Sequence, residues 1–278
     1  MADSASDALP QHQGRALELE MRTSATPEQI WNAWADPQKI SQWFADDAEG
    51  WAHKGAEVTR IFDEFGYRIP YHVVESIPGE CIILGGQMPG RIPFMLEVTI
   101  KRVGGETVVR LVNSGFLEGG SFDEEYEGVA SGWHLALAML KYYAEQHYGV
   151  AKAQVLLTRE AEFDLTRLPQ WYTQPDLLNA WLTTHANVRA ENSSYVLDLQ
   201  NGPRVEGVVA AITRREAAYV WPAQNAMIEL KGWAAGERKI LAVRVTGWNS
   251  KAPDQLRPVL AAALTRLSNL VGTASAPA

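Results

Sequence analysis

The sequence predicts an α+β protein of two tandem domains, each with a curved antiparallel sheet packed on a long C-terminal helix. Two observations lead to this fold class. The longest helical pattern of the chain, residues 121–149, follows a series of segments with strand-like alternation. A second such series precedes another helical pattern at residues 253–270. The element order of the first half therefore returns in the second, which is typical of an internal duplication. Two unrelated α+β domains are the alternative.

The long helix is predicted from a single apolar stripe. Its apolar side chains recur at steps of three or four residues, which places them on one face of a helix. The stripe consists of Phe122, Tyr126, Val129, Trp133, Leu137 and Leu140. Ser121 is expected to cap the start of the helix and Gly149 to stop it. Because the stripe is partly aromatic, the helix needs a large apolar surface, and a curved sheet is the expected partner.

Composition and charge limit the possible functions. The 278 residues are 46% apolar and 21% charged, as in a soluble globular protein, and the formal net charge is −8. This charge argues against nucleic acid as a partner, and the lack of a long apolar run argues against a membrane span. Residues 1–14 and 273–278 are expected to be a disordered leader and tail. Cys81, the single cysteine, is expected to be a reduced, buried strand residue. A cytoplasmic location is the default expectation.

The first half opens as a strand followed by two helices. Residues 15–23 alternate apolar and polar side chains, as a half-buried strand does. Thr26 and Gln29 form a capping box around Pro27, which suits the first position of a helix. A second short helix is expected at 38–44. The segments that follow, up to the long helix, are typical of strands: 56–63, 67–77, 80–87, 92–103 and 106–116.

The second half repeats this order with less regular opening helices. Residues 154–160 are typical of a strand, 164–168 of a helical turn and 175–183 of an amphipathic helix. The Asn201-Gly202 pair is the strongest short hairpin signal in the chain. Further strands are expected on either side of it and up to the final helix: 195–200, 204–213, 217–221, 226–234 and 239–248.

Three motifs of the first half match a known family. They are Ala25-Thr26-Pro27-Glu28-Gln29-Ile30-Trp31, the stretch from Trp34 through Asp36-Pro37 to Trp43-Phe44, and Gly132-Trp133 followed by Leu137. In order and spacing they resemble the START-like helix-grip superfamily, also called Bet v 1-like or SRPBCC. Within it, the chain is most similar to the family named for the C-terminal domain of the Hsp90 ATPase activator (AHSA1-like). From the resemblance we expect a helix-grip domain at residues 15–149. From the repeated order of elements we expect a second, divergent helix-grip domain at residues 150–272.

The resemblance implies a sheet that grips the long helix and encloses a cavity. In this superfamily such cavities hold lipids, sterols, polyketides or other apolar molecules. We therefore expect an intracellular protein that binds a small hydrophobic or amphipathic ligand between the sheet and the C-terminal helix, with no cofactor and no metal. Aromatic and large aliphatic side chains that converge on the helix are expected to form the wall of the cavity. These are Trp43, Phe44, Trp51, Tyr71, Phe116, Trp133 and Leu137.

Two rival functions stay open. An interaction module with a protein partner, such as a chaperone regulator, would have a filled core and an exposed apolar patch. A cyclase or hydrolase would need a polar pair inside the cavity, and the sequence offers Glu97 with His72. Because Glu97 alternates with Leu96 and Val98, it is expected to face solvent. No zinc-binding, nucleotide-binding or nucleophile-elbow motif occurs. Ligand identity, catalytic residues and oligomeric state are left open.

Overall fold

The computed structural model describes residues 14–63, 66–87 and 92–274. Most of the predicted leader and tail lies outside these residues. The first half forms a seven-stranded antiparallel sheet with the strand order β1-β7-β6-β5-β4-β3-β2. Its elements are β1 (Arg15–Thr23), α1 (Pro27–Ala35), α2 (Pro37–Ile40), β2 (Asp47–Glu49), β3 (Glu57–Phe62), β4 (Tyr67–Ile77), β5 (Cys81–Gly86), β6 (Phe94–Val103), β7 (Glu106–Phe116) and α3 (Ser121–Gln146).

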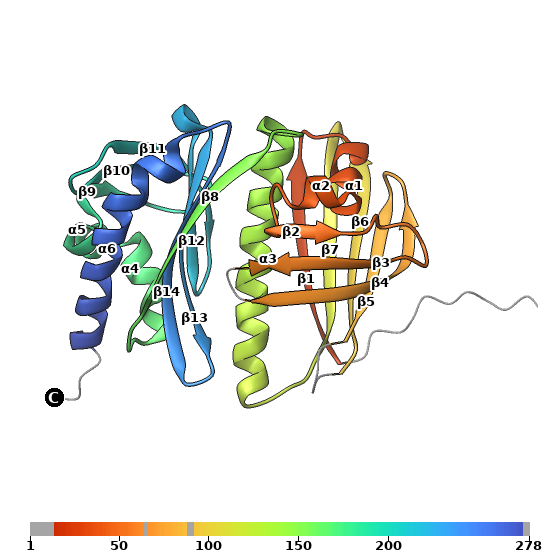
Figure 1. Cartoon of the computed structure of the whole chain (residues 1–278), viewed down its shortest axis with the longest axis horizontal. Coiled ribbons are helices and arrows are strands. Elements are labelled where there is room, and N and C mark those ends of the chain that lie inside the picture. Colours follow the sequence, from red (N-terminus) through yellow and green to blue (C-terminus); the bar gives the residue numbers. More distant parts are fainter. Residues whose placement is uncertain (1–13, 64–65, 88–91, 275–278) are drawn as a thin grey trace, which may run out of the picture.

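The second half forms another seven-stranded sheet, with the order β8-β14-β13-β12-β11-β10-β9. The first strand of each half thus pairs with the last, and the others follow in reverse, so the predicted fold class and the tandem repeat are confirmed (Figure 1). Its elements are β8 (Lys152–Glu160), η2 (Leu165–Arg167), α4 (Leu168–Thr173), α5 (Pro175–Trp181), β9 (Thr183–Asn187), β10 (Ser194–Leu199), β11 (Arg204–Ile212), β12 (Glu216–Trp221), η3 (Pro222–Gln224), β13 (Ala226–Ala235), β14 (Arg238–Trp248) and α6 (Ala252–Ala274).

Local sequence signals explain how the first helices begin. Thr26 Oγ1 accepts a hydrogen bond from the Gln29 backbone N–H at 3.1 Å, and Gln29 Oε1 accepts one from the Thr26 N–H at 2.8 Å. This is the predicted capping box. The long helix differs from the prediction at both ends. Its N-cap is Gly120 rather than Ser121, and it ends at Gln146, three residues before Gly149.

Helix α3 lies between the two sheets (Figure 1). One side packs on the inner face of the first sheet, and the other contacts β11 and β12 of the second. Ala211, Ala218, Val220, Met227 and Trp248 of the second half belong to the same hydrophobic cluster as α3. Helix α6 covers the opposite face of the second sheet, where it contacts β8 and β14. The second sheet is therefore buried on both faces, and seven successive residues of β13 are buried.

Polar contacts join the two domains where the chain passes from one to the other. The Trp248 indole N–H donates to the Gln42 carbonyl at 3.0 Å, and the Lys152 backbone N–H donates to Gln42 Oε1 at 2.8 Å. Lys152 Nζ also donates to the Ala45 carbonyl at 2.7 Å. The Trp248 ring stacks on His147, with the ring centroids 4.9 Å apart. Strand β14 and the turn after α2 are thus tied together. Among the described helices, none is long and apolar enough to cross a membrane.

Trp248→Ala tests this junction. Because the Trp248 side chain is fully buried and fixes both Gln42 and His147, its truncation should lower the free energy of unfolding by about 3–5 kcal/mol. Chemical denaturation followed by circular dichroism measures this. The matched control is Trp51→Ala, since Trp51 is 47% exposed, and it should have a much smaller effect. Equal effects of the two substitutions would contradict a junction centred on Trp248.

Candidate functional site

A pocket of about 260 Å³ lies between the two domains. The first domain supplies its wall from the turn after α2, from β3 and from α3, and the second domain supplies the facing wall from β12, β13 and β14. The first-domain residues are Trp43, Phe44, Phe62, Val129, Gly132, Trp133, Leu135, Ala136 and Met139, and the second-domain residues are Glu216, Glu229, Lys231 and Arg244. One wall is therefore apolar and largely aromatic, and the other is charged.

The aromatic wall is held rigidly. Phe44 stacks on Trp133 with ring centroids 5.0 Å apart and an interplanar angle of 12°, and Phe62 meets Phe44 edge-on at 5.2 Å. The Trp133 indole N–H donates to Asn113 Oδ1 at 3.0 Å, and the Asn113 amide in turn donates to the Met95 carbonyl at 3.1 Å. Because this chain of hydrogen bonds ends on the backbone of β6, the orientation of Trp133 is set by the first sheet.

The charged wall comes from three neighbouring strands of the second sheet. Glu216 of β12 lies directly opposite Lys231 of β13, and Glu229 of β13 lies opposite Arg244 of β14. Lys231 Nζ is 2.9 Å and Arg244 Nε 3.8 Å from Glu229 Oε2. The Glu229 side chain is 1% exposed. Four ionisable groups thus share one buried face of the sheet, and we call them the charged tetrad.

The two carboxyl groups of the charged tetrad have different environments. Burial raises the pKa of Glu216, with the charge of Glu229 adding to the effect and Lys231 opposing it. Burial also acts to raise the pKa of Glu229, but Lys231 and Arg244 together outweigh it, so the pKa of Glu229 is lowered. Glu216 Oε2 is buried without a hydrogen-bond partner among the described residues. The arrangement suits one group to hold a proton and the other to stay ionised.

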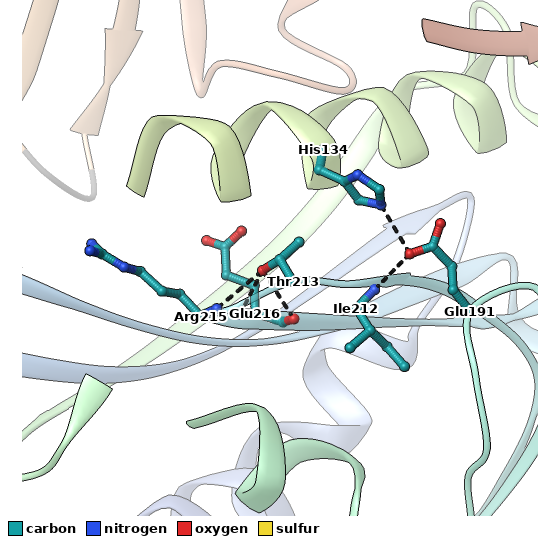
Figure 2. Close-up of polar contacts among 6 residues, drawn as sticks. All are labelled: His134, Glu191, Ile212, Thr213, Arg215 and Glu216. Atoms are coloured by element: carbon teal, nitrogen blue, oxygen red, sulfur yellow. Dashed lines mark hydrogen bonds and ion pairs between the residues drawn. The ribbon is translucent and has the colours of Figure 1, made fainter. Parts of the chain in front are cut away.

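The start of β12 is fixed beneath α3, and this aims Glu216. Thr213 Oγ1 accepts hydrogen bonds from the backbone N–H groups of Arg215 at 3.2 Å and Glu216 at 3.0 Å. Figure 2 shows the Glu216 carboxyl group pointing from the strand toward α3. Beside it, His134 of α3 lies 3.0 Å from Glu191 Oε2, which also accepts from the Ile212 backbone N–H at 3.0 Å. Contacts between the two domains therefore hold the start of β12, and with it Glu216, in place.

The structure separates the seven residues predicted to line a cavity. Trp43, Phe44 and Trp133 line the pocket between the domains. Leu137 is buried on α3, while Tyr71 and Phe116 are buried in the first-domain core. Trp51 lies after β2 and is 47% exposed. The binding role of all seven residues stays a prediction.

The polar pair considered from the sequence is not brought together. His72 Nδ1 lies 2.9 Å from Glu57 Oε1 on the neighbouring strand β3, and both side chains are exposed. Glu97 lies on β6 between Leu96 and Val98, which are in the core, so it projects from the other face of the sheet as the alternation predicts. Cys81, expected to be buried, is half-buried at the start of β5.

Sequence reasoning missed the charged tetrad. A signal was present in β13, where Glu229 and Lys231 interrupt the apolar run from Ala226 to Trp233 at alternate positions. Two charges on one face of a strand with apolar neighbours on the other are usually assigned to solvent. Here that face is covered by α3 of the other domain, which the sequence of one half alone does not reveal.

Glu229→Gln tests the charged tetrad. A carboxyl group with a lowered pKa in the folded state stabilises that state above the unfolded pKa, and this contribution is lost as the pH falls. The substitution should therefore cost about 3–5 kcal/mol at pH 7, because Lys231 and Arg244 lose a buried counter-charge. The difference from the wild type should shrink below about pH 4.5. Urea denaturation at pH 7 and pH 4 measures both values, with the exposed Glu206→Gln as the control. A loss independent of pH would contradict the ionised state of Glu229.

The chain was compared with known proteins. No curated protein matches it. Among solved structures it is similar to the di-domain ARO/CYC BexL from the BE-7585A biosynthetic pathway, at 13% identity and a TM-score of 0.45, over 95% of this chain and 100% of that one. It is similar to DynU16 from the dynemicin biosynthetic locus at 14% identity and a TM-score of 0.43, over 92% and 98%.

A third similar structure covers the first half alone. The Aha1 dimer from Colwellia psychrerythraea matches at 20% identity and a TM-score of 0.43, over 49% of this chain and 99% of that one. At such identities no ligand or reaction is transferred. A sequence model of one protein family also matches the first half of the chain. The family resemblance drawn from the motifs of the first half is thus confirmed, since residues 24–145 match the family described as Activator of Hsp90 ATPase homolog 1-like protein.

Proposed function

We propose that this protein binds a small amphipathic ligand in the pocket between its two domains. The observation that supports the proposal is the contrast between the two walls, one aromatic and one made of buried ionisable groups. Pockets for small molecules are mostly apolar and contain a few polar groups that fix the orientation of the ligand. The aromatic wall would take the apolar body of the ligand, and Glu216 and Lys231 would take its polar end.

The size of the pocket limits the ligand. A volume of about 260 Å³ is slightly below the range of about 300–1,000 Å³ that is usual for drug-sized molecules. A compound of two or three fused or linked rings fits this space better than a sterol or a diacyl lipid. Phe44 and Trp133 present stacked ring systems, which favours a planar, unsaturated ligand that can extend the stack.

A pocket-filling substitution tests the proposal. Gly132 of α3 lines the pocket, and a Cβ atom added there meets no heavy atom within 4 Å. Gly132→Leu should therefore fill the pocket without straining the helix, and the better helix propensity of Leu should keep the domain folded. We expect the affinity for 1-anilinonaphthalene-8-sulfonate, an aromatic anion used as a fluorescent probe, to fall at least tenfold.

The matched control is Gly272→Leu. It makes the same change in helix α6, at another glycine whose added Cβ meets no heavy atom within 4 Å. Its affinity for the probe should equal that of the wild type. Native mass spectrometry of the wild type and of Gly132→Leu should show a co-purified compound on the former only. Unchanged probe affinity in Gly132→Leu would refute binding at this pocket.

Acid–base catalysis is a second candidate, favoured by the opposite pKa shifts of Glu216 and Glu229. A protonated Glu216 could donate its proton to a carbonyl oxygen of the bound ligand. If the compound identified on the protein is converted on incubation, Glu216→Gln should lower the rate about 10²–10⁴-fold with little change in affinity. A rate that does not depend on Glu216 would exclude this role.

A further inference from the structure

A second hollow adjoins α3, on a different face of the helix from the pocket described above. Its volume is about 480 Å³, within the range of about 300–1,000 Å³ that is usual for small-molecule sites. Ala138, Tyr142 and Glu145 line this hollow, whereas Gly132 and Ala136 line the first pocket. Because residues three or four positions apart share a helical face, the two sets belong to two different faces of α3.

Both domains contribute to this second hollow, which we call the His147 hollow. Its lining includes Tyr142, Glu145 and His147 from α3 and its C-cap, and Val208, Val220 and Asn225 from the second domain. Val208 is 43% exposed, so an apolar surface at the mouth of the hollow is accessible from solvent. Small-molecule sites combine apolar surface with a few polar groups in the same way.

The plane of the His147 ring is fixed by aromatic packing. The side chain is buried, its ring stacks on Trp248 at an interplanar angle of 6°, and Tyr142 meets it edge-on with the ring centroids 4.7 Å apart. The Trp248 backbone N–H donates to the Asn225 carbonyl at 3.0 Å. Trp248 therefore holds both His147 and the facing wall of the hollow in place.

The His147 imidazole has a hydrogen bond left to make. Its Nε2 atom is buried and has no hydrogen-bond partner among the described residues, and such an atom costs a fold about 1–3 kcal/mol. Burial lowers the pKa of His147, which favours the neutral ring with one N–H donor and one acceptor nitrogen. A half-turn about the Cβ–Cγ bond exchanges the two edges of the ring but keeps its plane. A ring nitrogen can therefore turn to the hollow without loss of the stack on Trp248.

These features define the chemistry of a ligand. A hydroxyl group both donates and accepts, so it pairs with a nitrogen of His147 in either tautomer of the ring. The Glu145 carboxylate is already bound, since its Oε1 accepts from Thr23 Oγ1 and from the Ser24 backbone N–H, both at 2.9 Å. A ligand carboxylate would meet the negative charge of Glu145, and an ammonium group has no acceptor capacity of its own.

We propose that the His147 hollow is a second ligand site, which binds a compact, uncharged and mainly apolar molecule through a hydroxyl group hydrogen-bonded to His147. The apolar body of this molecule would lie between Tyr142 and the β11 side of the hollow. The site uses a different face of α3 from the pocket between the domains, so each proposal can fail without the other.

Two matched probes test the site. The probe 2-naphthol carries one hydroxyl group on an apolar ring system, and 2-methylnaphthalene has nearly the same shape without a hydroxyl group. Both are titrated against the full-length Gly132→Leu variant, in which the first pocket is filled. We expect 2-naphthol to bind about tenfold more tightly than 2-methylnaphthalene. Adding His147→Phe, which keeps an aromatic ring but has no nitrogen, should remove this difference by weakening 2-naphthol alone.

The matched control is His185→Phe, the same change at an exposed histidine of β9, and it should leave the affinity for 2-naphthol unchanged. The imidazole nitrogen NMR signal that His147→Phe removes should shift when 2-naphthol saturates the parent protein. If His147→Phe does not fold, Val208→Trp fills the hollow from its exposed mouth and should weaken both probes at least tenfold. Three results would each overturn the proposal: no binding of 2-naphthol, equal affinities for the two probes before His147 is changed, or an unchanged affinity in Val208→Trp.

Discussion

Everything in this structure depends on one helix that is packed on both sides. Helix α3 ends the first domain and packs on the inner face of its sheet, as the apolar stripe from Tyr126 to Leu140 predicts. Phe122, the first residue of the predicted stripe, is exposed instead. Its opposite side lies on β11 and β12 of the second sheet. A helix packed on both sides exposes little of its surface, and of residues 131–144 Lys141 alone is exposed. The second sheet is in turn enclosed by α3 on one face and α6 on the other.

This enclosure explains why ionisable groups lie in the interior. In a sheet with one solvated face, Glu229 and Lys231 would occupy ordinary solvent positions. Once α3 covers that face, the same side chains must pair with one another, and the cross-strand register brings Glu216 and Arg244 to them. Burial acts to raise the pKa of both carboxyl groups, and the pKa of Glu216 is raised. The pKa of Glu229 is lowered instead, because Lys231 and Arg244 together outweigh the effect of burial. The packing of the domains therefore creates the chemistry of the pocket.

The sequence predicted the elements better than their assembly. The bounds of β1, β4 and β7 agree with the predicted segments to the residue, because alternation and turn residues define these strands locally. Strand β2, of three residues, was missed because its pairing with β3 and not its own pattern makes it a strand. Strand β9, which pairs with β10, was missed for the same reason. The short helix α4 was also missed. The pocket between the domains could not be predicted from the sequence. Its aromatic wall faces residues of the second domain that lie more than eighty positions further along the chain. The periodicity of a single segment carries no information about such a contact.

Arg60 shows what strand parity could have revealed. In β3 the inward face is defined by Val58, and residue 60 falls on the same face. The prediction of this strand considered only its apolar residues. It therefore overlooked Arg60, a charged residue at a core position. An arginine at such a position is costly to the fold unless something balances it. The Arg60 guanidinium donates to the Trp34 carbonyl, and the Trp34 ring contacts Trp133 of the pocket wall, with the ring centroids 5.8 Å apart. Ionisable groups are thus buried among mainly apolar side chains both at Arg60 inside the first domain and at the charged tetrad between the domains.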